Sequence, residues 1–224
     1  MITAFIINYQ RLTLPARMAD YLAEYEGVTP VIVDNASDYP PLLEYYKTTP
    51  HKVVRLNFNF GQLAVYHPAS PVFPDSGVLP TERFIVTDPD LLIDHMPGDW
   101  LQLLHEGLDK YDFATKAGFS LRTDDLPNTP IGNAARAHEA SAWISPLENG
   151  RFYRAYIDTT FSLLRGYNQD FPAVRTGPPY TAIHVPWYYK TLADVPEDEL
   201  YYMRSTLARG STDWTIRIRE ALGA

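Results

Sequence analysis

Short apolar runs that each end in a polar residue recur along the first part of the chain, and they constrain its fold more than any other feature. The runs span residues 4–7, 31–33, 52–56 and 84–86, and the polar residues that follow them are Asn8, Asp34, Asn57 and Asp88. Helical or irregular segments separate the runs, which is typical of strands in a mostly parallel sheet. Such sheets bind ligands outside the carboxyl ends of their strands. We therefore expect an α/β fold with a ligand crevice at these polar residues.

The sequence Asp88-Pro89-Asp90 places two carboxylates at the end of the last of these runs. Pro89 cannot donate to a sheet ladder, so the strand is expected to stop there and to leave both carboxylates at its carboxyl end. Two hard oxygen donors one residue apart suit a divalent cation. The pattern alone is weak, and it gains weight from the strand that precedes it.

The composition of the 224 residues fits one compact domain, because 46% of them are hydrophobic and no low-complexity tract divides the chain. The formal charge of -8 argues against a general nucleic-acid surface. The absence of cysteine excludes disulfides and thiolate metal sites and is consistent with a cytoplasmic location. We expect no signal peptide, because a strand begins close to Thr3, and no membrane span, because no apolar run approaches roughly 18 residues.

The pattern changes after Asp90. Apolar spacing predicts a helix at Trp100–Lys110 and a strand over 113–122. Residues 127–148 are rich in Pro and have little periodicity, so we expect a loop or short-helix insertion that forms one wall of an acceptor site. Residues 152–164 favour β-structure, 177–180 predict a turn, and 197–209 and Asp213–Leu222 predict closing helices.

The sequence resembles the GT-A glycosyltransferases, and among them the family 2-like group. The resemblance consists of four motifs that stand in the family's order within residues 3–92. They are Asn8-Tyr9-Gln10-Arg11, Val33-Asp34-Asn35-Ala36-Ser37, Asn57-Phe58-Asn59-Phe60-Gly61 and Thr87-Asp88-Pro89-Asp90-Leu91. The ordered set is far more specific than any one motif. The family's Glu-Asp pair, which supplies the catalytic base in inverting members, has no counterpart that can be placed after residue 120.

The resemblance implies a GT-A fold and a metal-dependent transfer of sugar from a nucleotide-diphosphate-sugar, expected to be a UDP-sugar, to a hydroxyl acceptor. It implies that residues 1–92 form the nucleotide-sugar-binding half of one domain and residues 93–224 the acceptor-binding half. Asp90 would ligate Mn²⁺ (or Mg²⁺), and Asp88 would touch the ribose or a metal-bound water. The remaining nucleotide-site residues that it implies are Asn8, Arg11, Asp34, Asn35, Asn59 and Gly61.

His184 is a candidate third metal ligand. By resemblance, many GT-A enzymes supply such a ligand from a C-terminal His, and the surrounding Tyr180, Pro186 and Trp187 would hold the imidazole rigidly. Ligation by both carboxylate and imidazole favours Mn²⁺ over Mg²⁺. The alternative is a structural histidine, which is the role we expect for His51, His67, His95, His105 and His138.

Three carboxylates compete for the general base of an inverting transfer. Asp158 is the first candidate, because an acid in an apolar, Thr-rich stretch is costly without a role. Asp125 and Asp124 come next, since they follow a predicted strand and precede Pro127. A turn or capping role is the alternative for this pair, and a hydrogen-bonded structural role is the alternative for Asp158.

Two other functions remain open from the sequence. A sugar-phosphate nucleotidylyltransferase would have a Gly-rich loop after its first strand, and Asn8-Tyr9-Gln10-Arg11 contains no glycine. A non-catalytic module that binds nucleotide-sugars or glycans is disfavoured by the intact Asp88, Asp90 and His184. The acceptor is not determined: a glycan, a small molecule and a modified base are all compatible with the sequence.

Overall fold

The computed structural model describes residues 1–167, 172–207 and 213–223, and it is an α/β fold. The strands are β1 (Ile2–Asn8), β2 (Val28–Asp34), β3 (Lys52–Arg55), β4 (Arg83–Thr87), β5 (Leu91–Leu92), β6 (Lys116–Leu121), β7 (Pro146–Leu147), β8 (Phe152–Arg154), β9 (Ser162–Arg165) and β10 (Ala173–His184). The helices are α1 (Thr13–Glu24), α2 (Pro40–Thr48), α3 (Val72–Ser76), α4 (Trp100–Lys110), α5 (Pro130–Glu139), α6 (Glu197–Leu207) and α7 (Asp213–Leu222).

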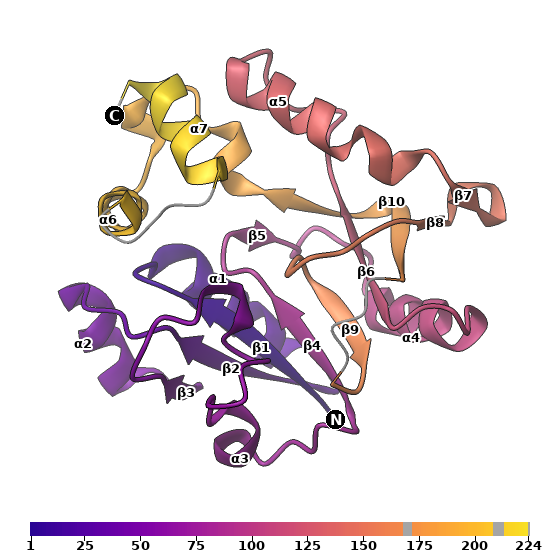
Figure 1. Ribbon diagram of the computed structural model, residues 1–224, viewed down its shortest axis with the longest axis horizontal. Helices are drawn as coiled ribbons and strands as arrows, with labels where there is room; N and C mark the ends of the chain where they lie inside the picture. The colour runs from indigo at the N-terminus through magenta and orange to yellow at the C-terminus, as the bar shows by residue number, and fades with distance from the viewer. Residues whose placement is uncertain (168–171, 208–212, 224) are drawn as a thin grey trace.

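The central sheet has the strand order β3-β2-β1-β4-β9-β6-β10-β8-β7, and β5 pairs with β10 outside this path. Strands β1 to β4 run parallel to one another, and so do β6 and β10, whereas β9 runs antiparallel between β4 and β6. Helices flank the sheet (Figure 1). The predicted fold class, a GT-A-like and Rossmann-like α/β sheet, is confirmed by this arrangement.

Both faces of the first strands are buried, which explains why these strands read as continuous apolar runs. Side chains alternate between the two faces. Ala4 and Ile6 belong to the core that also contains residues of α1 and α4. Phe5 and Ile7 belong to a second core, closed by the segment around α3. The sheet is therefore rigid where its polar ends begin.

The structure departs from the predicted elements in the second half of the chain. The expected loop or short-helix insertion contains α5, a helix of 10 residues, which begins where the Thr129 hydroxyl accepts a hydrogen bond from the Gly132 amide. β10 runs through the expected turn, with a register shift against β6 between Thr176 and Thr181. The predicted β-rich stretch is interrupted at residues 155–161, so Asp158 lies in a loop. The predicted extension of α6 to 209 lies outside the described residues.

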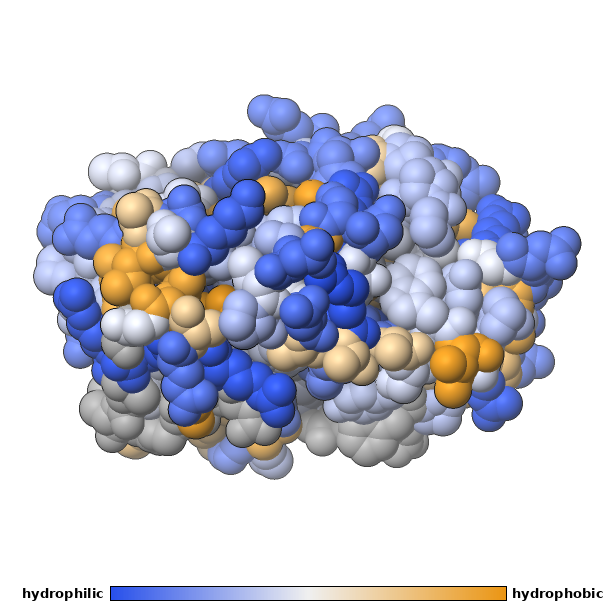
Figure 2. Space-filling view, turned by 90° about the horizontal axis from the view of Figure 1, so that it is seen from above, coloured by the Kyte–Doolittle hydropathy of each residue, from blue (hydrophilic) through white to orange (hydrophobic). Residues whose placement is uncertain are grey.

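The described helices include none long and apolar enough to cross a bilayer. Figure 2 shows one face of the molecule, on which hydrophilic colour predominates and hydrophobic colour gathers in limited areas. The described residues thus bury their large apolar surfaces mainly inside the two cores.

Candidate functional site

Strand pairing brings Asp90 and His184 together. β5 begins directly after Asp90 and pairs antiparallel with the end of β10, so that Leu91 lies opposite His184. The backbone amide of Val185 donates to the carbonyl oxygen of Asp90 at 3.1 Å. As a result, His184 Nε2 lies 3.7 Å from Asp90 Oδ2. The ring of Trp187, centred 4.4 Å from the imidazole, holds His184 from the other side.

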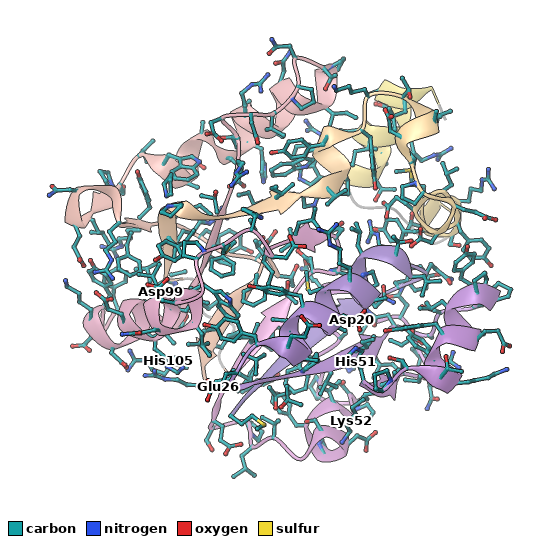
Figure 3. All side chains as sticks on the ribbon, turned by 180° about the vertical axis from the view of Figure 1, so that it is seen from behind. Asp20, Glu26, His51, Lys52, Asp99 and His105 are labelled. Carbon is teal, nitrogen blue, oxygen red and sulfur yellow. The ribbon has the colours of Figure 1, made fainter. Side chains whose placement is uncertain are left out.

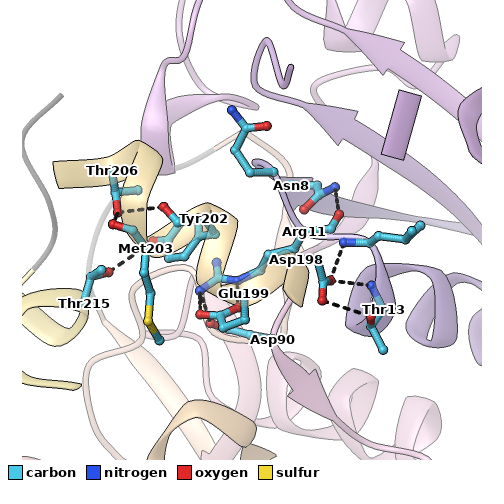
Figure 4. Close-up of polar contacts among 12 residues, drawn as sticks. Asn8, Arg11, Thr13, Asp90, Asp198, Glu199, Tyr202, Met203, Thr206 and Thr215 are labelled. Atoms are coloured by element: carbon cyan, nitrogen blue, oxygen red, sulfur yellow. Dashed lines mark hydrogen bonds and ion pairs between the residues drawn. The ribbon is translucent and has the colours of Figure 1, made fainter. Parts of the chain in front are cut away.

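Arg11 lies in the turn that follows β1, and its side chain connects Asp90 to α6 (Figure 4). Its Nη2 lies 3.2 Å from Asp90 Oδ2, and its Nε and Nη2 donate to the two carboxylate oxygens of Glu199 at 2.5 and 2.9 Å. The guanidinium carbon stands 3.5 Å from the centre of the Tyr202 ring. Burial acts to lower the pKa of Arg11, but the charges of Glu199 and Asp90 raise it, so the side chain stays cationic.

Helix α6 is fixed over this site by a second acidic residue. Asp198 Oδ2 accepts hydrogen bonds from the backbone amides of Leu12 and Thr13, each at 2.7 Å, and its Oδ1 accepts one from the Thr13 hydroxyl at 3.1 Å. These amides stand at the start of α1, which has no side-chain cap of its own. Asp198 therefore caps α1 from a distant part of the sequence and anchors α6 beside Arg11.

Asp88 and Asp158 add two carboxylates to the site. Burial and the charges of Asp158 and Asp90 raise the pKa of Asp88 well above its usual range. Asp158 Oδ1 accepts hydrogen bonds from the Thr160 amide and hydroxyl, at 3.1 and 2.8 Å. Partial removal from water acts to raise the pKa of Asp158, but these hydrogen bonds and the charge of Arg175 lower it, so Asp158 is ionised at neutral pH.

The donor set suits a hard divalent cation, although the cation would need ligands from outside the chain. Asp90 Oδ1 and His184 Nδ1 are buried without a hydrogen-bond partner among the described residues. Burial first, and then the charges of Asp158 and Asp90, raise the pKa of Asp88, and a bound cation would oppose this effect. No group of three His, Cys, Asp or Glu residues in the described ranges is arranged to enclose an ion by itself.

Asn8 and Asp34, expected in the nucleotide site, lie beneath it. Both are fully buried. Asp34 accepts hydrogen bonds from the Tyr46 hydroxyl at 3.2 Å and from Arg55 Nε at 3.1 Å, and Asn8 Nδ2 donates to the Arg11 carbonyl at 2.7 Å. Neither residue lines the cavity described below. In this conformation, the two side chains shape the turn that carries Arg11.

Asn35, Asn59 and Gly61 lie in two adjoining loops at the same sheet edge. Asn35 Nδ2 donates to the Gly61 carbonyl and its Oδ1 accepts from the Phe60 amide, each at 3.1 Å. Asn59 Oδ1 accepts from the Gly61 amide at 2.8 Å. Gly61 has a φ of +57°, a value that a side chain rarely allows. All three residues line the cavity.

Asp125 and Asp124 lie away from the carboxylate cluster. Asp125 accepts a hydrogen bond from the Tyr188 hydroxyl at 2.6 Å and pairs with Arg122 at 3.6 Å. Neither acid lines the cavity.

His51 and His105, labelled in Figure 3, also lie outside the cavity. His51 Nε2 is 2.7 Å from Asp20 Oδ1, and His105 Nδ1 is 2.7 Å from Arg83 Nη1.

A cavity of about 820 Å³ unites the clustered residues, a volume typical of small-molecule sites. The cavity is lined by the strand ends and loops that follow β1 to β4, and by parts of α5, α6, α7, β10 and the loop before β9. Of the predicted site residues it is lined by Arg11, Asn35, Asn59, Gly61, Asp88, Asp90, Asp158 and His184.

Sequence reasoning missed several residues that line this cavity. Glu199 stands within a predicted helix, where an acid is normally solvated. Glu139 and Arg175 form a buried ion pair of 2.6 Å although 36 positions separate them. Trp214 of α7 and His138 of α5 complete the wall, with ring centres 5.3 Å apart. The charge of Arg175 directly after the apolar Ala173 and Val174 was a usable signal, whereas Glu139 became recognisable only through the fold.

Replacing Asp88 by Asn is expected to raise the melting temperature of the metal-free protein by a few degrees, about 2–4 °C per kcal/mol. Because the folded-state pKa of Asp88 is raised, the folded protein retains a proton that the unfolded chain has lost, and stability falls as the pH rises from the ordinary Asp value through the raised one. Thermal melts across this pH range would check the sign. Asp112→Asn, at an exposed position outside the cavity, is the control. A lower melting temperature for Asp88→Asn at every pH would contradict the interpretation.

No protein-family model matches the chain, and no curated protein matches its sequence significantly. Among solved structures, glucosyl-3-phosphoglycerate synthase from Mycobacterium tuberculosis, in complex with phosphoglyceric acid, is 12% identical, with 73% of this chain and 56% of that chain covered and a TM-score of 0.39. 4-Diphosphocytidyl-2C-methyl-D-erythritol synthase is 13% identical, with coverage of 98% and 84% and a TM-score of 0.41. TarS from S. aureus is 12% identical, with coverage of 97% and 41% and a TM-score of 0.47.

The chain thus spans about half of the glucosyl-3-phosphoglycerate synthase structure and less than half of the TarS structure. Those two are GT-A-like glycosyltransferases, and 4-diphosphocytidyl-2C-methyl-D-erythritol synthase is a related nucleotidyltransferase. Since the scores lie below 0.5, the fold assignment of this chain rests on its own strand order.

Proposed function

We propose that the protein is a metal-dependent glycosyltransferase that moves a sugar from a nucleotide-diphosphate-sugar, most simply a UDP-sugar, to a hydroxyl acceptor with inversion of configuration. One observation supports this proposal above the others. Asp88, Asp90 and Asp158 meet in one cavity at the carboxyl ends of the strands, next to His184 and the cationic Arg11.

The donor end would be organised by Asp90, Asp88 and Arg11. Asp90 would hold Mn²⁺ or Mg²⁺, assisted by His184, with Asp88 as a direct ligand or as the partner of a metal-bound water, and diphosphate oxygens would complete the coordination. A divalent cation bound here would stabilise the negative charge of the diphosphate leaving group. Arg11, fixed by Glu199, would present a permanent positive charge to the same leaving group.

Asp158 would act as the general base. Its lowered pKa keeps it ionised, and it lies within electrostatic range of both Asp88 and Arg175. In the reaction, the acceptor hydroxyl oxygen forms a bond to C1 of the sugar, the C1–O bond to the diphosphate breaks, and the hydroxyl proton passes to the Asp158 carboxylate. The products are a glycoside and a nucleoside diphosphate.

A thermal-shift screen of nucleotide-sugars tests the donor class. With Mn²⁺ present, the correct nucleotide-sugar at a hundredfold excess over its Kd should raise the melting temperature by roughly 5–10 °C, because it binds the native state alone. The same compound without a divalent cation should have a much smaller effect. If no nucleotide-sugar shifts the melting temperature in either condition, the proposal fails.

Product analysis separates the remaining functions. Release of the nucleoside diphosphate from the donor would identify an enzyme, whereas binding without release would identify a non-catalytic module. Release of pyrophosphate from a nucleoside triphosphate and a sugar phosphate would instead identify a nucleotidylyltransferase. The acceptor would then be sought among glycans, small molecules and modified bases.

A further inference from the structure

The cavity wall contains a buried ion pair that the proposed chemistry does not use. Glu139 of α5 and Arg175 of β10 are 3% and 5% exposed, and both line the cavity. Arg175 Nη1 donates to Glu139 Oε2 at 2.6 Å, and Arg175 Nε donates to the Tyr156 carbonyl at 2.7 Å. A buried pair of this kind is a poor source of net stability, so its presence in a cavity wall invites a functional explanation.

Each partner retains hydrogen-bonding capacity. Within the described part of the chain, no group donates a hydrogen bond to Glu139 Oε1 or accepts one from Arg175 Nη2, and His138 Nε2 lies 4.0 Å from Oε1. One side of the pair therefore offers an N–H donor and the other a carboxylate acceptor. A hydroxyl group both donates and accepts, so two adjacent hydroxyls match the pair. A ligand with a single anionic group would match the guanidinium but be repelled by Glu139.

The surroundings favour the same ligand chemistry. Tyr156, whose carbonyl accepts from Arg175 and whose residue surface is 52% exposed, lines the cavity beside the pair. Trp214 adds aromatic surface near Glu139, because its ring lies 5.3 Å from that of His138. Aromatic side chains combine an apolar face with a polar edge, which suits the mixed surface of a sugar ring. The carboxylates of Glu139 and Asp158 outnumber the one guanidinium here, so the local charge disfavours a phosphate or carboxylate ligand.

We propose that the Glu139–Arg175 pair is the acceptor-recognition site, and that it selects a neutral carbohydrate bearing adjacent hydroxyl groups. This inference rests on the proposed glycosyl transfer. The pair lies close enough to Asp158 for the charge of Arg175 to act on it, and Asp158 in turn lies close to Asp88. A sugar held by the pair would thus direct a hydroxyl toward the base and the donor.

Saturation-transfer NMR with uncharged methyl pyranosides tests the site without requiring turnover. Methyl gluco-, galacto- and mannopyranosides would be compared with deoxy analogues that lack one hydroxyl of each adjacent pair, in the presence of UDP and the diamagnetic cation Mg²⁺. We expect at least one parent glycoside to bind, and its deoxy analogue to bind roughly tenfold or more weakly, as for the loss of a hydrogen bond to a charged group. Equal binding of parent and deoxy sugars, or preferential binding of glucose 6-phosphate, would overturn the proposal.

Conservative substitutions in the ion pair provide a second test of the proposal. Glu139→Gln and Arg175→Lys should weaken binding of the same glycoside roughly tenfold or more. Metal-dependent UDP binding should stay within about twofold, because the hydrogen bonds and the ion pair of these two residues do not involve Asp90, Asp88 or Arg11. Glu106→Gln and Arg151→Lys are matched controls, since Glu106 and Arg151 form an ion pair of the same 2.6 Å length outside the cavity.

The outcomes separate this inference from the donor assignment. Unchanged glycoside binding in both folded cavity variants would remove the pair from the acceptor site. If the cavity variants fail to fold, the deoxy analogues on the unmodified protein still decide the question. If the unmodified protein binds no nucleotide-sugar, the glycosyltransferase proposal fails, and glycoside binding measured without nucleotide continues to test the pair as a sugar site.

Discussion

Replacing Asp90 by Ala is expected to abolish divalent-cation-dependent nucleotide binding and to reduce sugar transfer by about 10³-fold or more. Asp90 Oδ1 is buried without a hydrogen-bond partner among the described residues, so it is the carboxylate oxygen most in need of a ligand. The variant should fold, because Glu199 continues to neutralise the buried Arg11 through two hydrogen bonds. Calorimetric titration of Mn²⁺ and UDP, together with a thermal melt, would measure both effects.

Asp94→Asn is the matched control for Asp90→Ala. Asp94 is a nearby acid that pairs with Arg17 in solvent and does not line the cavity. The Asp94→Asn substitution should leave cation-dependent nucleotide binding unchanged. Full transfer activity in Asp90→Ala, or unaltered Mn²⁺ affinity, would remove the metal site from the proposal.

Replacing Asp158 by Asn is expected to lower turnover by about 10²–10⁴-fold while donor affinity hardly changes. The amide oxygen can still accept the hydrogen bonds of Thr160, so the side chain should keep its position and lose only its ability to take a proton. Steady-state kinetics with donor and acceptor varied separately would measure the two quantities, and NMR of the product would give its anomeric configuration.

Asp125→Asn should be mild by comparison, because Asp125 bonds to Tyr188 outside the cavity. The reverse result, a large loss for Asp125→Asn with near-normal turnover for Asp158→Asn, would reassign the base. If both variants remain active and the product keeps the donor's anomeric configuration, the inverting mechanism itself is wrong.

The first strands were predictable because the pattern that identifies each of them lies within a few consecutive residues. A parallel strand buried on both faces must be a short continuous apolar run, and the polar residue that follows it marks its carboxyl end. The same logic placed Asp88 and Asp90 at the sheet edge. It could not separate a side chain that faces a ligand from one that supports the turn below. Asn8 and Asp34 stand at equivalent strand ends, yet both point into a buried hydrogen-bond network.

The second half of the chain was less predictable because its structure depends on contacts between distant residues. Pro127, Pro130 and Pro146 indicated an irregular insertion, although Pro130 occupies the first turn of α5, where proline is favourable. Only the fold brings Glu139 beside Arg175, and a single sequence contains no periodicity that links them. Asp158, selected as an acid that is costly without a role, lies in the loop before β9 and lines the cavity.

The ion pair between Arg11 and Glu199 spans 188 positions of the sequence, and Asp198 caps α1 across a similar distance. Contacts of such long range form late, because the entropy of closing a large loop must be overcome before they contribute. During synthesis, the β1 to β4 region can therefore assemble its sheet well before Arg11 acquires its partner. A ribosome-bound chain that lacks α6 would leave Arg11 with Asp90 as its anionic partner and without Glu199, and this part of the cavity would mature only when α6 docks.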